Sequence, residues 1–310
     1  ELSDDYHQRT RIVTYQQVAT AISLVLVLVL PIAAEQWRPG DGALKLNAMG
    51  VFVIASMLPA ALSALPAFRE PPLPARPPAR APLSVTLALL ARETLLLRVL
   101  GSDFAVNLAQ NIRGTLFVFF VSRVAGLPQW AGGLFLLQFL FGILAGPIWL
   151  RVGYRLGKHR AAIAGELVQV AVNLALLLVT PGALGLLLAL TVAQGLAQGS
   201  GNQMLRAIVA DVADKHRLDS GADRSALFFS VFSLAGKAAM AAAIGVALPL
   251  IAWLGFNPAG SNTPAALRGV ALVFALGPAL THILAAWLIY GFPLDEDAHG
   301  RIRRALAERD

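Results

Sequence analysis

The chain has 310 residues, of which 57% are hydrophobic and only 14% are charged. An ordinary soluble domain carries about 25% charged residues, and a chain of this length has too little interior to bury so many apolar side chains. The formal net charge of +7 would suit nucleic acid, but the basic residues are scattered among long apolar runs and form no continuous stripe. Composition therefore argues against a soluble enzyme and a nucleic-acid partner, and it predicts a protein of the lipid bilayer.

The first residues of the chain and its lack of cysteine bear on whether it is a whole protein and on which covalent and metal sites it can have. The sequence begins at Glu1, and its first apolar run follows a charged stretch and not a signal peptide. We therefore expect a fragment of a longer protein. The chain contains no cysteine, so it has neither a disulfide framework nor a thiolate metal site.

Eight apolar stretches have about the 20 residues that a helix needs to cross the hydrocarbon core. They are Gln17–Ala34, Leu46–Phe68, Ser102–Val124, Trp130–Leu150, Ala161–Thr180, Leu184–Ala207, Leu227–Leu254 and Leu267–Tyr290. Only helices and closed barrels can satisfy their backbone groups in a bilayer, and these stretches lack the alternation of barrel strands. The sequence predicts an all-α, polytopic membrane bundle with eight transmembrane helices.

Basic residues are distributed unevenly between the two sets of connecting loops. The termini and alternate loops on one side carry 19 Lys and Arg residues, and the loops on the other side carry four. Because Lys and Arg accumulate in cytoplasmic loops, we expect both termini of this chain to be cytoplasmic. Arginine outnumbers lysine 21 to 4, which favours a bacterial inner membrane.

A proline-rich segment between the second and third spans predicts a boundary within the chain. Residues 69–83 contain six prolines, a density that favours an extended connector over a helix. We therefore divide the chain into residues 1–68, the linker 69–83, a six-helix bundle at 84–292 and a cytoplasmic tail at 293–310. Ser84–Val99 is apolar but is interrupted by charges, so it is either an interfacial helix or an early start of the third span.

Lys237 is the clearest ionisable residue inside a predicted span. It lies about ten residues into its helix, too deep for the ammonium to reach either interface easily. Such a group needs a carboxylate, an aqueous cavity or a lowered pKa. The alternative is a lysine that pairs with a neighbouring helix for packing alone.

Amide side chains gather on one face of the third predicted span. Asn107 and Asn111 are four residues apart and Gln110 lies beside them, so all three share a face. Amides in hydrocarbon need partners, so this face is expected to point inward. It either lines a hydrophilic cavity or holds helices together by hydrogen bonds.

Two aspartates close the sixth predicted span, where the helix dipole disfavours carboxylates. Asp211 and Asp214 are placed to pair along the helix with Lys215 and Arg217 respectively. The other interpretation is an inter-loop salt bridge that acts as a gate. A third interpretation, a divalent-metal site of a membrane-embedded transferase, lacks a second acidic cluster. His282, within the last span, has no metal-ligand companions at helical spacing and is expected to be a packed polar residue.

These motifs resemble the glycoside-pentoside-hexuronide:cation symporters, the melibiose-permease-like branch of the major facilitator superfamily. Several positions carry the resemblance: Glu1, Asp5, Tyr6, Arg9, Thr10, Asn107, Asn111, Asp211, Asp214, Lys237 and the segment Tyr290–Asp295. The segment Gly146–Arg155 is similar to a superfamily loop motif at Gly146, Arg151, Gly153 and Arg155, although Leu150 replaces its acid. The resemblance implies helices five to twelve of a twelve-helix fold, with the first four helices missing.

The resemblance also implies roles for residues. It makes Lys237 a charge partner and coupling element, and it assigns the acidic cation ligands to the missing helices. Gln17 stands where melibiose-type transporters have a sugar-contacting arginine, and Asn202 stands where they have an aromatic residue, which argues against a galactoside. We expect substrate-facing roles for Lys237, Asn107, Asn111, Gln17 and Asn202. The expected cytoplasmic gate consists of Asp211, Asp214, Arg151 and Arg155.

The sequence therefore predicts a secondary active transporter, not an enzyme, with no cofactor and no bound metal beyond its coupling ion. It would couple uptake of a sugar or glycoside to Na⁺ or H⁺ by alternating access, as a monomer in the bilayer of the cell membrane. A lysolipid symporter of the same broad family and a metal-dependent transferase are the alternatives.

Overall fold

The computed structural model describes residues 6–38, 42–67 and 83–309, and every regular element in these ranges is a helix. The α-helices are α1 (Tyr6–Trp37), α2 (Gly42–Ala67), α3 (Leu83–Arg92), α4 (Thr94–Phe119), α5 (Ala131–Leu156), α6 (Lys158–Ala175), α7 (Leu184–Gln198), α8 (Ser200–Ser220), α9 (Ser225–Trp253), α10 (Pro264–Ile289) and α11 (Glu296–Ala307). A π-helical turn, Phe120–Val124, continues α4, and short 3₁₀ turns cover Pro128–Trp130 and Leu176–Leu178. The predicted all-α fold is confirmed.

Six helical segments in the described residues are long and apolar enough to cross a membrane. They are Thr94–Val124, Pro128–Leu156, Lys158–Leu178, Leu184–Ser220, Ser225–Trp253 and Pro264–Ile289. These segments match the last six predicted spans, of which three extend one or two residues beyond the helical segment, to Thr180, Leu254 and Tyr290. The first predicted span lies within α1, and the second lies within α2 except for Phe68, which is outside the described residues. The apolar stretches of the described residues there, Val18–Val27 and Leu46–Leu62, are shorter.

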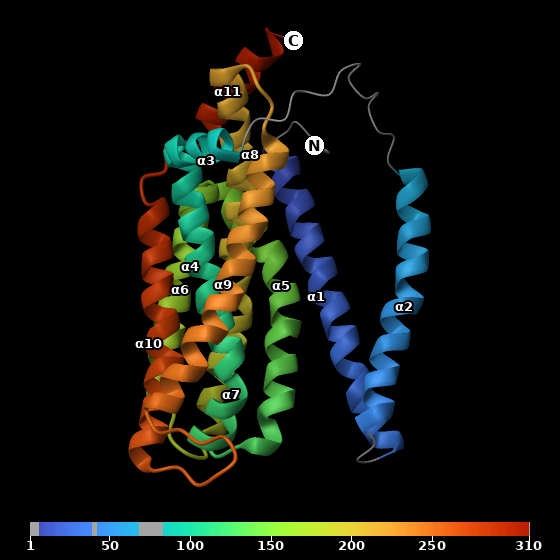
Figure 1. The fold of residues 1–310 in the computed structure, drawn as a ribbon, viewed down its shortest axis with the longest axis vertical. Helices are drawn as coiled ribbons and strands as arrows, with labels where there is room; N and C mark the ends of the chain where they lie inside the picture. The colour runs from blue at the N-terminus through green and yellow to red at the C-terminus, as the bar shows by residue number, and fades with distance from the viewer. Residues whose placement is uncertain (1–5, 39–41, 68–82, 310) are drawn as a thin grey trace. The chain divides into compact units, whose positions relative to one another are not determined.

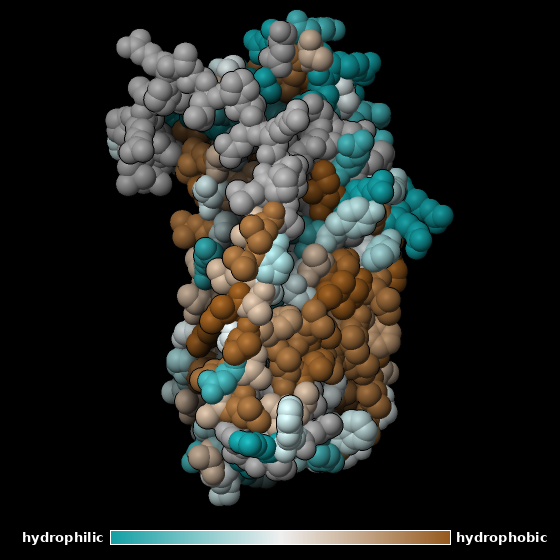
Figure 2. All heavy atoms as spheres, turned by 90° about the vertical axis from the view of Figure 1, so that its right-hand side faces the viewer, coloured by the Kyte–Doolittle hydropathy of each residue, from teal (hydrophilic) through white to brown (hydrophobic). Residues whose placement is uncertain are grey.

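Many large apolar side chains are exposed along the helices, and some of those near helix ends are aromatic. Figure 2 shows hydrophobic side chains over the middle of the visible face and hydrophilic ones at its upper end. Leu280 on α10 is exposed, as are Trp253 at the end of α9 and Trp287 near the opposite end of the α9–α10 hairpin. Aromatic residues at both ends of a span are typical of the two membrane interfaces. The protein is therefore a multi-pass membrane protein.

The chain divides into two compact units. One contains Glu93–Asp310 together with the start of the chain up to Ala19, and the other contains Thr20–Arg92. The proposed linker, 69–83, lies outside the described residues except for Leu83, which is the first residue of α3. Glu93 interrupts the helical conformation between α3 and α4 (φ −81°, ψ 80°), so Ser84–Val99 is a short helix followed by the start of the span.

Within the larger unit, α4 packs against both α9 and α10, while α6 packs against α10 and α8 (Figure 1). Phe120 and Phe274 stack with ring centroids 4.3 Å apart in the apolar part of the core. Helices α6 and α8 approach so closely that a Cβ on Gly165 would overlap the Ser200 hydroxyl. Small residues at such crossings let the two backbones meet.

The predicted span at residues 184–207 lies in one helical segment, Leu184–Ser220, that a turn at a single residue divides into two helices. α7 ends at Gln198, α8 begins at Ser200, and Gly199 lies between them. α8 then extends to Ser220, where Gly221 ends it in the left-handed conformation (φ 71°) that glycine adopts without strain. The predicted span is therefore confirmed, and the turn at Gly199, whose backbone stays in the right-handed helical region (φ −78°, ψ −13°), is a local feature that hydropathy does not reveal.

The predicted tail is also structured. The Asp295 carboxylate accepts a hydrogen bond from the Ala298 backbone N–H and caps α11. α11 buries His299, Ile302 and Leu306, and it packs against α8.

Candidate solute pocket and charge clusters

A pocket of about 190 Å³ opens between α4, α8 and α9. Its lining combines a carboxylate, a guanidinium, two amides, a hydroxyl and two aromatic rings. The lining residues are Asp103, Asn107, Asn202, Arg206, Phe229, Phe232, Ser233 and Gly236. One wall is therefore charged and hydrogen-bonding, and another is aromatic.

Helical spacing explains how the polar groups converge. Asp103 and Asn107 are one turn apart on α4, and Asn202 and Arg206 are one turn apart on α8. Gly236 of α9 brings the third helix close, since a Cβ there would lie 3.6 Å from both Asp103 Oδ2 and Asn107 Nδ2. The absence of a side chain at residue 236 leaves these two polar groups accessible from the pocket.

The amides of the pocket wall are only partly satisfied by the protein. The Asn107 amide donates to the Asp103 backbone carbonyl at 2.8 Å, and the Asn202 amide donates to Gln110 Oε1 at 3.1 Å. Asn202 Oδ1 is buried and has no hydrogen bond within the described part of the chain. Asn111 lies outside the pocket lining, and its amide donates to the Asn107 carbonyl at 2.8 Å. The structure thus places Asn107 and Asn202 at the pocket, and Asn111 one turn away.

Lys237 follows the pocket-lining Gly236 on α9, but its side chain is exposed. It makes no hydrogen bond or ion pair with any residue that the structure describes. Its predicted partner, a carboxylate on another helix, stays a prediction.

The remaining predicted site residues lie elsewhere. Gln17 belongs to α1, and its side chain falls outside the described part of the structure. Arg151 and Arg155 are exposed near the end of α5 and form no ion pair with described residues. The structure therefore does not bring these two arginines to Asp211 and Asp214, and their gating role stays a prediction.

Asp211 and Asp214 instead belong to a buried charge cluster at the α11 end of the bundle. The Lys158 ammonium donates to both carboxylate oxygens of Asp211 at 2.7 and 2.9 Å. His299 Nε2 lies 3.2 Å from Asp214 Oδ2 and 3.5 Å from Asp211 Oδ1, and Arg303 reaches Asp214 Oδ1 at 3.8 Å. Among the described residues this cluster ties together α6, α8 and α11.

The two sequence interpretations of these aspartates can now be compared. Lys215 pairs with Asp219 at 2.5 Å, so the expected pairing of Asp211 with Lys215 was wrong. Asp211 instead pairs with Lys158 of another helix, and the interpretation as an inter-loop salt bridge that acts as a gate stays a prediction. The sequence did not reveal Lys158 as the partner of Asp211, because the two residues are 53 positions apart. The available signal was the position of Lys158 at the start of α6.

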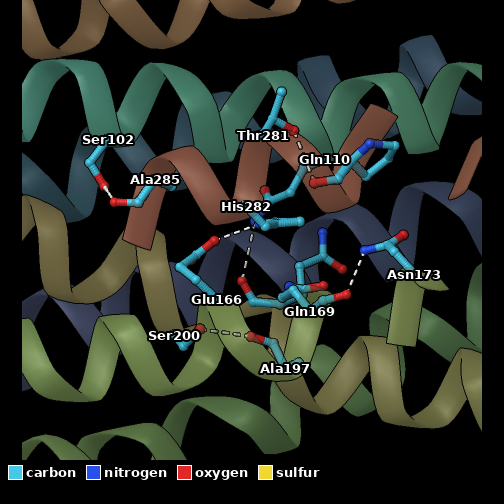
Figure 3. Close-up of polar contacts among 12 residues, drawn as sticks. Ser102, Gln110, Glu166, Gln169, Asn173, Ala197, Ser200, Thr281, His282 and Ala285 are labelled. Carbon is cyan, nitrogen blue, oxygen red and sulfur yellow. Dashed lines mark hydrogen bonds and ion pairs between the residues drawn. The ribbon is translucent and has the colours of Figure 1, made fainter. Parts of the chain in front are cut away.

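A second buried polar group lies in the middle of the bundle (Figure 3). Glu166 Oε2 of α6 lies 2.5 Å from His282 Nδ1 of α10, and both side chains are almost completely buried. Deeper along the same face of α6, Asn173 Oδ1 accepts from Arg113 Nη1 at 3.1 Å, and the guanidinium lies over the Phe274 ring. His282 is therefore a packed polar residue, as predicted, but its acidic partner was not foreseen.

Arg206 is a further residue that sequence reasoning missed. It lies inside the predicted span Leu184–Ala207, on α8 one turn beyond Asn202, but was not considered as a site residue. The four-residue spacing from Asn202 was the available signal. In the ranges that the structure describes, no group of three or more His, Asp or Glu side chains could hold a metal ion.

Comparison with known proteins places this architecture in a family. The chain is 25% identical over 236 residues to "Uncharacterized symporter YjmB" of Bacillus subtilis (strain 168). That alignment covers 73% of this chain and 49% of the relative, so the chain spans about half the length of the curated relative it matches. A family model described as MFS/sugar transport protein matches residues 1–296. The six apolar helices and this match agree: the chain belongs to the MFS/sugar transport family.

Proposed function

We propose that the protein couples uptake of a small sugar-like solute to Na⁺ or H⁺ by alternating access. The observation that carries this proposal is the α4–α8–α9 pocket, where Asp103 and Arg206 line a space of about 190 Å³ beside Phe229 and Phe232. Family membership supports transport, and the name of the Bacillus relative supports symport.

The composition of the pocket favours a polyhydroxylated solute. A sugar hydroxyl donates one hydrogen bond and accepts others, and carboxylate, guanidinium and amide groups offer both roles. Charge-assisted hydrogen bonds to Asp103 and Arg206 would be the stronger ones. The C–H face of a sugar ring can pack on Phe229 or Phe232. A lysolipid would need a continuous apolar path in addition to such polar groups.

The small volume of the pocket suggests that these three helices form only part of the solute-binding site. Complete small-molecule sites have volumes of about 300–1,000 Å³, and this pocket has about 190 Å³. The α4–α8–α9 pocket therefore serves as one wall, and residues outside it supply the rest. Gln17 and Lys237 remain proposed contributors to that remainder, and Asn111 would support the wall through Asn107.

Coupling of solute uptake to cation movement requires a charged group that interacts with both the solute site and the cation site. Lys237 follows the pocket residue Gly236 and has no ion-pair partner among the described residues. Its ammonium is therefore available to a carboxylate from another helix, and that carboxylate would also bind the coupling ion. The acidic cation ligands themselves are proposed to lie on helices that precede this chain in a twelve-helix protein. The proposed transporter needs no other cofactor and works as a monomer.

The charge cluster around Asp211 supports a closing contact at one membrane face. Buried pairs such as Lys158–Asp211 are costly to open without new partners, so they can hold a bundle in one of two arrangements. The basic loops orient this face, with both termini, towards the cytoplasm of a bacterial inner membrane. Arg151 and Arg155 are proposed to join the cluster when the protein changes state.

Uptake into right-side-out vesicles containing the full-length protein tests the proposal. Radiolabelled methyl glycosides, a pentoside and a hexuronide are offered with an imposed Na⁺ gradient, with choline replacing Na⁺, and with a protonophore. We expect uptake of at least one sugar class above vesicles without the protein, driven by one of the two cation gradients. Uptake of lysophosphatidylcholine but no sugar would replace the sugar proposal by a lysolipid one. A chelator-sensitive group-transfer activity would replace transport altogether.

A further inference from the structure

One side chain of α4, Gln110, connects the end of α7 to the start of α8. Its Nε2 donates to the backbone carbonyl of Gln198, the last residue of α7, with an N–O distance of 3.4 Å. Its Oε1 accepts from Nδ2 of Asn202, in the first turn of α8, at 3.1 Å. Gln110 is not part of the pocket lining, whereas Asn202 is. A chain of two hydrogen bonds therefore leads from the helix break to the pocket wall.

The backbone carbonyl of Gln198 determines how both amides are turned. A carbonyl can only accept, so Gln110 must direct its NH₂ group towards it. The Gln110 oxygen then faces Asn202, and because that oxygen can also only accept, Asn202 must direct its own NH₂ group towards Gln110. The oxygen of Asn202 is the end of this chain, and the protein has turned it away from Gln110.

Side chains of α5 hold the carbonyl end of α7 in place. Trp149 Nε1 donates to the Leu196 carbonyl at 2.7 Å, and Gln138 Nε2 donates to Gln198 Oε1 at 3.0 Å. The last carbonyls of a helix have no partner within the helix, so such donors fix its end. The two helices are also in close contact, since a Cβ on Gly195 would lie 2.5 Å from the Gln138 carbonyl oxygen. The group that orients Gln110 is therefore itself well held.

The oxygen of Asn202 lacks a donor. Asn202 Oδ1 is buried and accepts no hydrogen bond from the residues that the structure describes. Among the side chains that line the pocket, it is the one buried polar atom in this condition within the described part of the chain. Because a buried acceptor without a donor is costly, a ligand that supplies a donor is favoured over one that does not.

We infer that Gln110 is a positioning residue that sets Asn202 as a hydrogen-bond acceptor for the solute. The matching feature of the solute is an O–H or N–H group. A solute that presents only an acceptor at this point meets an oxygen and is rejected. The inference rests on the proposed solute transport, and it adds to that proposal the direction of one hydrogen bond and the residue that fixes it.

Asn107, in the same pocket wall, shows why Gln110 matters for Asn202. The Asn107 amide donates to the Asp103 backbone carbonyl one turn earlier, so α4 alone orients it. The Asn202 amide makes its hydrogen bond within the described residues to the side chain of Gln110. Replacing Gln110 therefore frees one asparagine of the pocket and leaves the other oriented.

Inhibition of uptake by deoxyfluoro sugars tests the inference. The probes are the sugar that the full-length protein takes up and its monodeoxyfluoro derivatives, because fluorine is close in size to a hydroxyl but cannot donate. In the wild type, we expect one derivative to bind at least about tenfold more weakly than the parent sugar. In Gln110→Met this ratio should fall to about threefold or less, because the Asn202 amide is free to turn. The KM for the parent sugar should rise while kcat stays nearly unchanged.

A double variant separates positioning from a general structural effect. Asn202→Leu removes the acceptor and should lower the same ratio, and adding Gln110→Met should lower it no further, because one residue acts through the other. The control Gln129→Met alters an exposed glutamine outside the pocket and should keep the wild-type ratio. Additive effects on the ratio would overturn the inference. So would a Gln110→Met protein that loses affinity equally for the parent and for every derivative.

Solid-state NMR tests the chain of hydrogen bonds without any transport. Protein with ¹⁵N in the asparagine side chains and ¹³C in the glutamine side-chain carbonyls should show a dipolar contact between the Asn202 nitrogen and a glutamine carbonyl carbon. The contact should be lost in Asn202→Leu and in Gln110→Met, and it should persist in Gln129→Met. A wild-type spectrum without this contact would overturn the inference, even if Gln110→Met does not fold.

The two experiments separate this inference from the proposed function. Failure of the wild type to take up any sugar would contradict the proposed function. The NMR contact would then decide by itself whether Gln110 orients Asn202.

Discussion

The ammonium of Lys158 and the carboxylate of Asp211 form a buried two-oxygen ion pair between the first residue of α6 and the middle of α8. Both side chains are at most 1% exposed. Taking two charges out of water is costly, and the geometry here compensates through both oxygens. The pair therefore fixes where α6 begins relative to α8.

Removing one member of this pair is predicted to destabilise the protein strongly. Lys158→Met or Asp211→Asn should each cost about 3–5 kcal/mol, because each leaves a buried group without its partner. The double variant Lys158→Met with Asp211→Leu should recover a large part of that loss. Thermal unfolding in detergent measures all three, and Lys215→Ala, which breaks an exposed pair, should cost at most about 1 kcal/mol. Additive losses in the double variant would contradict the direct pairing.

The close crossing of α6 and α8 predicts that two glycines tolerate no side chain. Gly165→Ala would clash with the Ser200 hydroxyl, and Gly201→Ala would displace the Glu166 carboxylate. Each substitution should reduce the free energy of unfolding by about 1–3 kcal/mol, as expected for overpacking, and should therefore lower the unfolding temperature. Gly245→Ala on α9 is the matched control, since a Cβ there meets nothing within 4 Å. That control should be neutral or gain up to about 1 kcal/mol of helix propensity.

Docking of α11 depends on its apolar face. Ile302→Ala and Leu306→Ala remove buried side chains and should each weaken docking by about 2–5 kcal/mol. Arg301, Arg303 and Arg304 should then become better trypsin sites, which limited proteolysis followed by mass spectrometry detects. Glu308→Ala, an exposed change in the same segment, should leave the digestion rate unchanged. Equal rates for all variants would show that α11 is not held by this face.

The charged groups of the α4–α8–α9 pocket are predicted to set the affinity for the solute. Asp103→Asn and Arg206→Gln should raise the KM for uptake about 10- to 100-fold, since hydrogen bonds to charged groups contribute about 1.5–3 kcal/mol. Concentration-dependent uptake measures the change, with the amount of folded protein checked in parallel. Ser230→Ala, whose hydroxyl bonds its own helix, should behave like the wild type. An unchanged KM in both charged variants would remove the pocket from the solute pathway.

The sequence was sufficient for the fold and for part of the site. Long apolar stretches without the alternation of barrel strands can cross a bilayer only as helices. The last six predicted spans therefore coincide, to within two residues, with described helices. Helical spacing also brought Asn107 to the pocket wall. The side-chain direction of Lys237 could not be predicted, because a span that is apolar on all sides gives no periodic signal for its inner face.

Contacts between distant helices escaped prediction for a different reason. Glu166 and His282 are separated by 116 residues, and Lys158 and Asp211 by 53, so neither pair leaves a local pattern in the chain. The proposed gate at Arg151 and Arg155 came from a resemblance of sequence, and no contact in the described residues bears on it.

Sugar uptake by a pair of Gly236 variants tests the account most directly. A Cβ at this position meets Asp103 and Asn107 at an ordinary contact distance of 3.6 Å, so Gly236→Ala should fold and keep measurable uptake. Gly236→Leu extends a side chain into the α4–α8–α9 pocket, and it should abolish uptake while the protein remains folded and membrane-inserted. Wild-type uptake by a correctly folded Gly236→Leu protein would contradict the claim that this pocket binds the solute.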